Sequence, residues 1–208
     1  MGLRIKVYPM GPLSENTYFI QDEASGKSAV VDPGYIGEDI VAAINDTEGL
    51  EYILLTHGHF DHFTAAEEYK KLYPDALLTA PEYEKYLLGK PLGYEAVYYG
   101  AKDKCCPPAD KYTSDGDTLK LGETELEYIH TPGHTEGSCC ILADKVLFSG
   151  DTLFRLSVGN TQLETGSWDT LVKSINEKLY TLDEETVVYP GHGAATTIGY
   201  EKKGNPFV

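Results

Sequence analysis

The segment LLTHGHFDHFTAAEEY, residues 54–69, constrains the fold most, because it concentrates potential metal ligands directly after an apolar, strand-like run. It carries three of the six histidines in the chain. Together with one aspartate they occupy four of six consecutive positions, as His57, His59, Asp61 and His62. A regular helix or strand would point these side chains in different directions, whereas a loop that pivots at Gly58 can turn them toward one point. A catalytic zinc ion typically takes about three protein ligands, so four here, plus others elsewhere, predict two ions.

Three more candidate ligands follow later apolar runs and are flanked by glycine: His134 in HTPGHTEGS, Asp151 in LFSGDTLF and His192 in VVYPGHGAA. Small neighbours let the backbone turn sharply, so the ends of distant strands can build one site. His130 lies on a predicted strand, and we expect it to pack or to orient a ligand rather than to bind metal. Asp32 ends another strand in VVDPG, where it can form the turn before Pro-Gly or orient a ligand histidine.

The length of 208 residues, with 41% hydrophobic and 24% charged residues, indicates one folded domain that spans residues 1–208. Apolar and β-branched runs predict strands at 3–9, 16–22, 27–32, 50–56, 76–80 and 186–190, and hairpins at 117–133 and 138–150. Helical spacing predicts helices at 36–46, 64–74, 80–90 and 167–182. Two series of strands followed by helices predict two sheets face to face with helices outside, in an α/β or α+β domain.

Residues 91–110 are rich in Gly, Pro and Tyr and form no regular pattern. Such a long irregular segment either covers a substrate site or packs its aromatic side chains on the surface. The four cysteines come as two adjacent pairs, which rarely turn both thiolates toward one metal, so we expect reduced thiols. Cys139 and Cys140 are predicted to lie in the core, whereas Cys105 and Cys106 lie in a loop.

The formal net charge of -16 opposes binding to nucleic acid, because it repels the phosphate backbone. Neither a signal peptide nor a membrane span is indicated, since no apolar run of about 18 residues occurs. We therefore expect a cytoplasmic protein that binds neither membrane nor nucleic acid. The oligomeric state is left open.

The motifs THGHFDH, TPGHTEGS, FSGDTLF and YPGHG, in this order, resemble those of the metallo-β-lactamase-fold hydrolases. The chain is most similar to the glyoxalase II (hydroxyacylglutathione hydrolase) branch, particularly its short bacterial members, whose ending PGHG…E…NPF it shares. The resemblance implies an α+β fold, a four-layer αββα sandwich with the site along one edge of the sheets. It also implies that one metal is held by His57, His59 and His134, and a second by Asp61, His62 and His192, with Asp151 bridging them.

Two zinc-like ions about 3.5 to 4 Å apart can share a water and lower its pKa toward neutrality, so that it attacks a carbonyl. Asp61, besides binding metal, can orient the resulting hydroxide. A thioester suits such a site because its thiolate, with a thiol pKa of about 8.5, leaves without a dedicated acid. The resemblance implies an acylglutathione such as lactoylglutathione as the small-molecule substrate. Zinc is the expected metal, with iron or manganese as alternatives.

Two departures from the family bear on the substrate. The chain ends sixteen residues after His192, without the C-terminal helical region that binds glutathione in longer glyoxalase II enzymes. Where relatives commonly carry Gly-Arg-Thr-Asp, this chain has GNTQL, so that Asn160 and Gln162 replace a charged pair, and Arg155 is the candidate substitute for contacting an anion. The physiological acyl and thiol groups stay open.

Other functions on the same fold remain as alternatives. A persulfide dioxygenase would use one Fe(II) held by two histidines and one aspartate. A hydrolase of another ester or a lactone would use the same two metals. A secreted β-lactamase is disfavoured because Asp151 occupies a position where lactamases often carry Cys or Ser, and a nuclease because no basic channel is visible. The last alternative is a metal-binding protein without catalysis.

Overall fold

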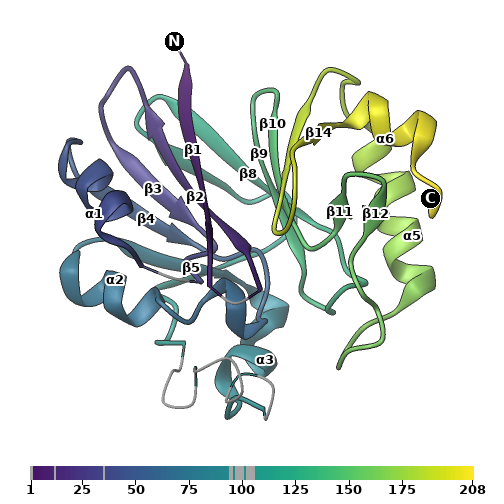
Figure 1. The fold of residues 1–208 in the computed structure, drawn as a ribbon, viewed down its shortest axis with the longest axis horizontal. Coiled ribbons are helices and arrows are strands. Elements are labelled where there is room, and N and C mark those ends of the chain that lie inside the picture. Colours follow the sequence, from purple (N-terminus) through teal and green to yellow (C-terminus); the bar gives the residue numbers. More distant parts are fainter. Residues whose placement is uncertain (1, 12, 35, 94–95, 97–100, 102–105) are drawn as a thin grey trace.

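The computed structural model describes residues 2–11, 13–34, 36–93, 96, 101 and 106–208. Two six-stranded sheets lie face to face with helices on their outer faces, as Figure 1 shows. This is the four-layer α+β sandwich predicted from the motifs. Most of the segment 91–104, and Cys105, lie outside the described residues, so the predicted lid role of residues 91–110 stays a prediction.

The first sheet has the order β1-β2-β3-β4-β5-β6. The strands are β1 (Leu3–Met10), β2 (Glu15–Asp22), β3 (Ser28–Val31), β4 (Leu50–Leu54), β5 (Leu77–Pro81) and β6 (Lys111–Thr113). The first three pair antiparallel, and β3 to β6 pair parallel. Parallel neighbours need crossover connections, which here contain α1 (Glu38–Asn45) and α2 (Ala66–Leu72). After β5 the chain forms the short 3-10 helix η2 (Glu82–Glu84) and then α3 (Lys85–Gly89).

The second sheet has the order β14-β13-β10-β9-β8-β7. Its hairpins are β7 (Thr118–Leu121) with β8 (Thr124–His130), and β9 (Cys139–Ala143) with β10 (Val146–Gly150), as predicted. The strands β13 (Val187–Pro190) and β14 (Thr196–Thr197) complete it. The helices α5 (Trp168–Glu177) and α6 (Ile198–Gly204), with the 3-10 turn η3 (Leu179–Thr181), cover its outer face, beside the small hairpin of β11 (Leu153–Phe154) and β12 (Ser157–Val158).

The alternation of side chains along each strand produces the layers, because successive residues point to opposite faces. In β2, Phe19 packs with the helices α1 and α2, while Tyr18 and Ile20 pack between the sheets. In β9, Cys139 lies between the sheets and Cys140 lies against α5, both buried, which confirms their core position. Each large apolar side chain buried in this way contributes about 1.5 to 3 kcal/mol.

The strand ends that matter for function meet at one edge. The parallel strands β3, β4 and β5 end there, and so does the parallel pair of β10 and β13 in the other sheet. Backbone bonds connect the sheets at this edge: Asn16 N donates to Gly191 O at 2.7 Å, and Cys139 N donates to Thr56 O at 3.0 Å. Loops that follow distant strands are therefore held next to one another.

Some elements differ from the prediction. The segment 80–90, predicted as one helix, starts with the end of β5 and continues as η2 and α3, because Pro81 is extended and Glu84 turns inward to a buried position. The strands β6, β11, β12 and β14 and the helix α6 were not predicted, since they are short or lack a periodic apolar pattern. Among the described residues, none of the helices combines the length and apolar content needed to cross a membrane.

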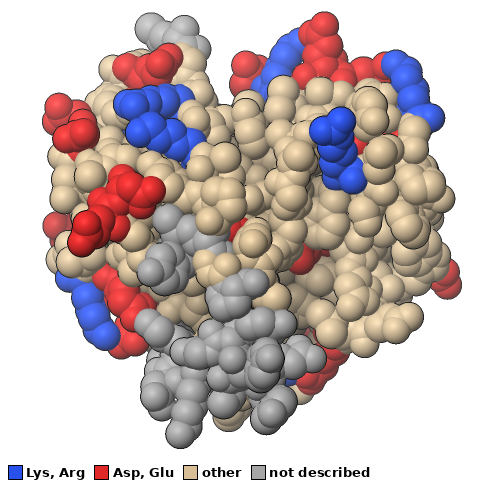
Figure 2. Space-filling model, in the orientation of Figure 1, with Lys and Arg blue, Asp and Glu red and all other residues tan. Residues whose placement is uncertain are grey.

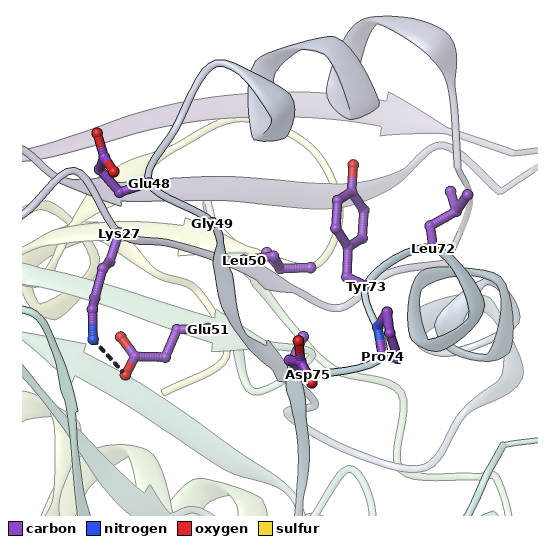
Figure 3. A pocket seen from close by; sticks show the side chains of 10 residues that line it. Lys27, Glu48, Gly49, Leu50, Glu51, Leu72, Tyr73, Pro74 and Asp75 are labelled. Atoms are coloured by element: carbon purple, nitrogen blue, oxygen red, sulfur yellow. Dashed lines mark hydrogen bonds and ion pairs between the residues drawn. The ribbon is translucent and has the colours of Figure 1, made fainter.

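Charged side chains are spread over the surface. On the face in Figure 2, Lys and Arg lie scattered among Asp and Glu, and the described residues of that face form no continuous basic band. A hollow near the start of β4 is lined by mixed charges, including the Lys27–Glu51 ion pair at 3.0 Å (Figure 3). None of the predicted ligands lines this hollow, and four of them follow the opposite end of β4, so the hollow is separate from them.

Candidate metal centre

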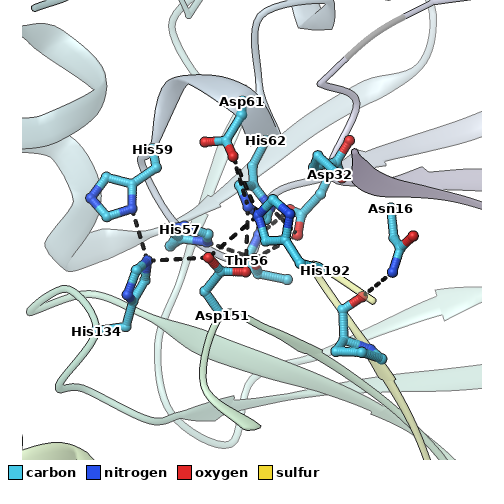
Figure 4. A network of polar contacts seen from close by, with 12 residues as sticks. Asn16, Asp32, Thr56, His57, His59, Asp61, His62, His134, Asp151 and His192 are labelled. Atoms are coloured by element: carbon cyan, nitrogen blue, oxygen red, sulfur yellow. Dashed lines mark hydrogen bonds and ion pairs between the residues drawn. The ribbon is translucent and has the colours of Figure 1, made fainter. Parts of the chain in front are cut away.

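Three histidines form the first ligand group. His57 and His59 follow β4, and His134 follows β8. Each offers one ring nitrogen, and these nitrogens lie within 4.8 Å of one another. Nδ1 of His59 is 2.8 Å from Nε2 of His134, so the two rings converge (Figure 4). These are the three residues that the family resemblance assigns to one metal.

The second group consists of Asp61, His62 and His192, whose ligand atoms also lie within 4.8 Å of one another. Asp61 and His62 lie in the 3-10 turn η1 (Phe60–His62), which begins directly after His59. Oδ2 of Asp61 is 3.3 Å from Nε2 of His192 and 3.8 Å from Nε2 of His62. The four crowded residues thus contribute to two groups, which adjoin each other, because His57 and His62 also lie close together beside Asp32.

Asp151 lies between the two groups (Figure 4). Its Oδ2 is 3.5 Å from Nε2 of His134 and 3.6 Å from Nε2 of His192, while its Oδ1 is 3.5 Å from Nε2 of His62. One carboxylate therefore contacts ligand atoms of both groups. This is the place that a bridging ligand must occupy.

Neighbouring groups hold three of the imidazole rings by Nδ1 and leave Nε2 toward the centre. Thr56 Oγ1 lies 3.0 Å from Nδ1 of His57. Asp32 Oδ2 lies 3.0 Å from Nδ1 of His62, and the carbonyl of Asn160 lies 2.7 Å from Nδ1 of His134. Partners of this kind fix the tautomer and orientation of metal-binding histidines.

The centre has the polar atoms that a cation needs. Within the described part of the chain, Nε2 of His57, Nε2 of His62 and Oδ1 of Asp151 are buried and have no hydrogen-bond partner. Leaving such atoms unpaired in the interior costs about 1 to 3 kcal/mol each. Imidazole nitrogens and carboxylates suit zinc, iron and other transition metals. The residues present therefore fit two divalent ions.

The protonation of the metal-free centre differs between the two groups: although burial opposes it, Asp151 and Asp61 raise the pKa of His62, and Asp61 raises that of His192, whereas the three imidazoles of the first group are neutral. Burial lowers the pKa of His59 to about 4 and that of His134 to about 3, and it holds the pKa of His57 well below its ordinary value. These imidazoles stay neutral and keep a lone pair for a metal. Burial would raise the pKa of Asp61, but His62 and His192 hold it well below its ordinary value. Burial raises the pKa of Asp151 to about 6.

Asp32 does more than form a turn. Its φ of 49° lies in the left-handed region, which directs the chain into the turn after β3. Its carboxylate accepts hydrogen bonds from Thr56 N at 2.8 Å and Thr56 Oγ1 at 2.7 Å, besides contacting His62. Of the two interpretations from the sequence, orientation of a ligand histidine is what the structure shows. Asp32, His57 and His62 also lie close enough to hold an ion, but both carboxylate oxygens of Asp32 already accept hydrogen bonds, so we assign Asp32 to orienting His62.

The predicted role of Gly58 as a backbone pivot was wrong. Its φ lies outside the left-handed region, so its backbone conformation does not require glycine. The requirement is space: a Cβ at Gly58 would lie 2.5 Å from Glu84 Oε2 and 2.8 Å from Leu87 Cβ. At Gly191 a Cβ would lie 2.3 Å from Asp151 Oδ1 and 2.6 Å from His62 Cε1. These two glycines admit the side chains that pack against the ligand loops.

Other candidates lie outside the two groups. His130 stacks on Tyr83 with 5.2 Å between ring centroids, and its Nε2 lies 2.9 Å from the carbonyl of Glu136, which agrees with a packing role. Arg155 is exposed, and its guanidinium lies 5.7 Å from the centre of the Tyr200 ring. Cys106 is partly buried and packs against the edge of the core that lies between the first sheet and the helices α1 and α2.

Two buried carboxyl groups near the centre were not predicted from the sequence. Glu15, at the start of β2, is 1% exposed, and burial raises its pKa well above the ordinary value. Glu84, at the end of η2, is fully buried. Both lie in segments with ordinary strand or helix patterns, where a charged residue is expected to face solvent. Only its position at a strand end could have marked Glu15.

Comparison with known proteins agrees with the fold. The sequence profile of the metallo-beta-lactamase superfamily matches residues 10–192. A hydroxyacylglutathione hydrolase of Haemophilus influenzae is 33% identical over 210 residues, which cover 99% of this chain and 98% of that protein. The crystal structure of the B3 metallo-beta-lactamase BLEG-1 has a TM-score of 0.88 and 34% identity, with 98% of this chain and 99% of that chain covered.

A crystal structure in a di-iron-bound form has a TM-score of 0.83 and 31% identity, with 98% of this chain and 100% of that chain covered. The chain belongs to the metallo-beta-lactamase superfamily. With its two groups of clustered ligands, it is a metallo-hydrolase of that superfamily, as predicted. The fold predicted from the motifs is confirmed.

Proposed function

We propose that this protein is a thioester hydrolase of the glyoxalase II type, with a centre of two divalent metals and an acylglutathione-type substrate. The observation that carries the proposal is the position of Asp151, within 3.6 Å of ligand nitrogens of both groups. A single ion would need only one group. A carboxylate between two groups supports two ions that act on one substrate.

In this proposal His57, His59 and His134 hold one metal, and Asp61, His62 and His192 hold the other, with Asp151 shared. Bound divalent metals supply Lewis acidity toward the acyl carbonyl and toward water. We propose zinc, because the donors are mainly imidazole nitrogens. The relative in a di-iron-bound form makes iron the principal alternative.

The side chain of Asp61 would orient the attacking water. Although burial would raise its pKa, His62 and His192 keep the carboxyl group ionised, so that it can accept a hydrogen bond from that water. The side chain of Asp61 is 15% exposed, so water can reach it. Asp32 holds His62 by Nδ1, which keeps the second ligand group in place.

A thioester is the substrate class that needs least from the protein. Its thiolate leaves without protonation, whereas an amide nitrogen must gain a proton from an acid. The similarity to a hydroxyacylglutathione hydrolase supports glutathione as the thiol. The Asn160 side chain carries no charge, and its Oδ1 accepts from Gln162 N at 2.9 Å within the loop, which leaves its amide N–H groups as the donors for a substrate contact.

A mononuclear iron dioxygenase acting on persulfides is the second candidate. The observation that favours it is that His57, His134 and Asp151 by themselves present two imidazoles and one carboxylate, with His134 and Asp151 at 3.5 Å. Two histidines and one carboxylate hold Fe(II) in many oxygenases and leave positions for O₂ and substrate. In that case His59, Asp61 and His192 would not be needed as ligands.

One experiment separates the two candidates. Protein purified without oxygen is analysed for metal content and then assayed for hydrolysis of lactoylglutathione and for O₂ uptake with glutathione persulfide. Two metals per chain with thioester hydrolysis support the proposal. One iron per chain with O₂ uptake and no hydrolysis would establish the dioxygenase instead. The variant His192→Ala tests the same point, because it should abolish hydrolysis and leave a mononuclear dioxygenase active.

A further inference from the structure

Glu84 connects the two loops that carry the first ligand group. It follows β5 in the first sheet, and α3 begins directly after it at the edge where β4 and β5 end (Figure 1). The side chain is fully buried, which is rare for a carboxyl group unless neighbouring groups hold it. It is not part of either ligand group.

On one side the carboxyl group contacts the turn after His134. Thr135 Oγ1 donates a hydrogen bond to Glu84 Oε1. Thr135 is itself held by Ser138, whose Oγ accepts from Thr135 N at 3.0 Å and lies 2.6 Å from Thr135 Oγ1. Gly137 closes the turn against the same carboxyl group, since a Cβ there would lie 2.7 Å from Glu84 Oε1.

On the other side the carboxyl group lies against the loop between His57 and His59. Oε2 faces Gly58, where an added Cβ would be 2.5 Å away. The backbone amide groups of Gly58 and Gly137 lower the pKa of Glu84, although burial is the larger effect and raises it to about 7. One side chain therefore touches both loops that supply His57, His59 and His134.

We propose that Glu84 is a positioning residue, whose carboxyl group sets the separation of the 57–59 and 134–138 loops so that the first ligand group converges on one metal. The inference rests on the proposed metal centre. It also explains why glycine is needed between the two histidines of THGH and in the turn after His134: a side chain at Gly58 or Gly137 would occupy the space of Glu84.

The test measures the two steps of Zn²⁺ binding by competition with a chromophoric chelator, in the parent protein and in Glu84→Ala. The steps are assigned with His59→Ala and His192→Ala, which remove a ligand of the first and second group. We expect Glu84→Ala to weaken the step lost in His59→Ala by about tenfold to a hundredfold, the usual effect of removing a group that orients metal ligands. The other step should keep its affinity.

The matched control is Glu201→Ala. Glu201 is also a fully buried carboxyl group that accepts from a threonine, Thr196 Oγ1, at 2.5 Å, but it connects α6 to β14 and touches neither ligand loop. Its loss should lower thermal stability as much as the loss of Glu84 and leave both Zn²⁺ affinities unchanged. If Glu201→Ala weakens Zn²⁺ binding equally, the role of Glu84 is only structural and the inference is wrong.

A second variant covers the case in which Glu84→Ala does not fold. Thr135→Val removes the donor to Glu84 with little change in volume, and it should weaken the same Zn²⁺ step. Unchanged affinity in the folded variants, or equal loss at both steps, contradicts the inference. A parent protein that binds only one ion refutes the two-metal proposal, whereas the inference on Glu84 is then decided by the affinity for that ion.

Discussion

Replacing Asp32 by asparagine should weaken the second metal site, through His62, more than the first site, which Asp32 reaches only through Thr56. The parent carboxylate accepts on both oxygens: Oδ1 from Thr56 N at 2.8 Å, and Oδ2 from Thr56 Oγ1 at 2.7 Å and from Nδ1 of His62 at 3.0 Å. Since a carboxylate only accepts, Nδ1 of His62 must carry the hydrogen, which leaves the lone pair of Nε2 for a metal.

An asparagine cannot satisfy both sides. If its amide nitrogen faces His62, it donates to Nδ1 and forces the hydrogen onto Nε2, so the ring loses the lone pair that a metal needs. If its amide nitrogen faces Thr56 instead, it meets the backbone N–H of Thr56, and two donors are opposed. A lost hydrogen bond to a charged group is worth about 1.5 to 3 kcal/mol. At about 1.4 kcal/mol per tenfold, the Zn²⁺ affinity of the second group should fall about tenfold to a hundredfold.

Zn²⁺ competition gives the affinities, and ¹⁵N NMR of the histidine rings reports the tautomer of His62 directly. Asp22→Asn is the control, because Asp22 is also buried and accepts from Ser25 N and Thr124 Oγ1, both at 2.8 Å, far along the sheet from the ligands. Unaltered Zn²⁺ binding in Asp32→Asn, or an equal loss in Asp22→Asn, would refute the reasoning.

Changes at Gly191, at Glu84 and in the bound metal should each have a measurable effect. Gly191→Ala should abolish binding of the second metal, because the added Cβ would lie 2.3 Å from Asp151 Oδ1. Metal analysis of the folded variant checks this. The control is Gly193→Ala, whose backbone is strained at a φ of 80° but which should bind both metals. In metal-free protein, the free energy of unfolding should fall by about 3 kcal/mol as the pH rises from about 4.5 past 7. The reason is that burial raises the pKa of Glu84 to about 7, so the folded state binds this proton more tightly than the unfolded state does. Urea titrations of Glu84→Gln should show no such pH dependence. Removal of metal by a chelator should lower the melting temperature, since free metal at a hundred times its Kd stabilises the fold by about 2.7 kcal/mol. Equal melting curves with and without chelator would contradict the binding of metal to the folded protein.

The sequence predicted the layers because its periodicity is strong where the strands are buried. The runs of β2 and β3 and the two hairpins of the second sheet alternate between the inter-sheet core and the helix-covered face, so the pattern alone locates them. Short elements such as β6 and β14 exist only because a neighbouring strand offers an open edge. Their own residues do not specify them, which is why no pattern revealed them.

The candidate ligands were predictable because histidine and aspartate next to glycine at strand ends are uncommon without a site. Which partners hold them was not predictable. The carbonyl of Asn160 that fixes His134, and the buried Glu84 that contacts Gly58 and Thr135, depend on contacts between residues 26 to 51 positions apart in the chain. Only the folded arrangement of the two sheets brings those groups together.

The glycines of the motifs show that some motif positions are set by the side chains that pack beside them. Gly58 was expected to bend the chain, yet its backbone is one that other residues can adopt; it is glycine because Glu84 and Leu87 fill the space beside it. Gly191 leaves room for Asp151 and His62, which come from different sheets. A glycine next to a ligand therefore marks the place where another segment packs against the ligand loop. The residues of that segment, such as Glu84, belong to no motif and are found only through this packing.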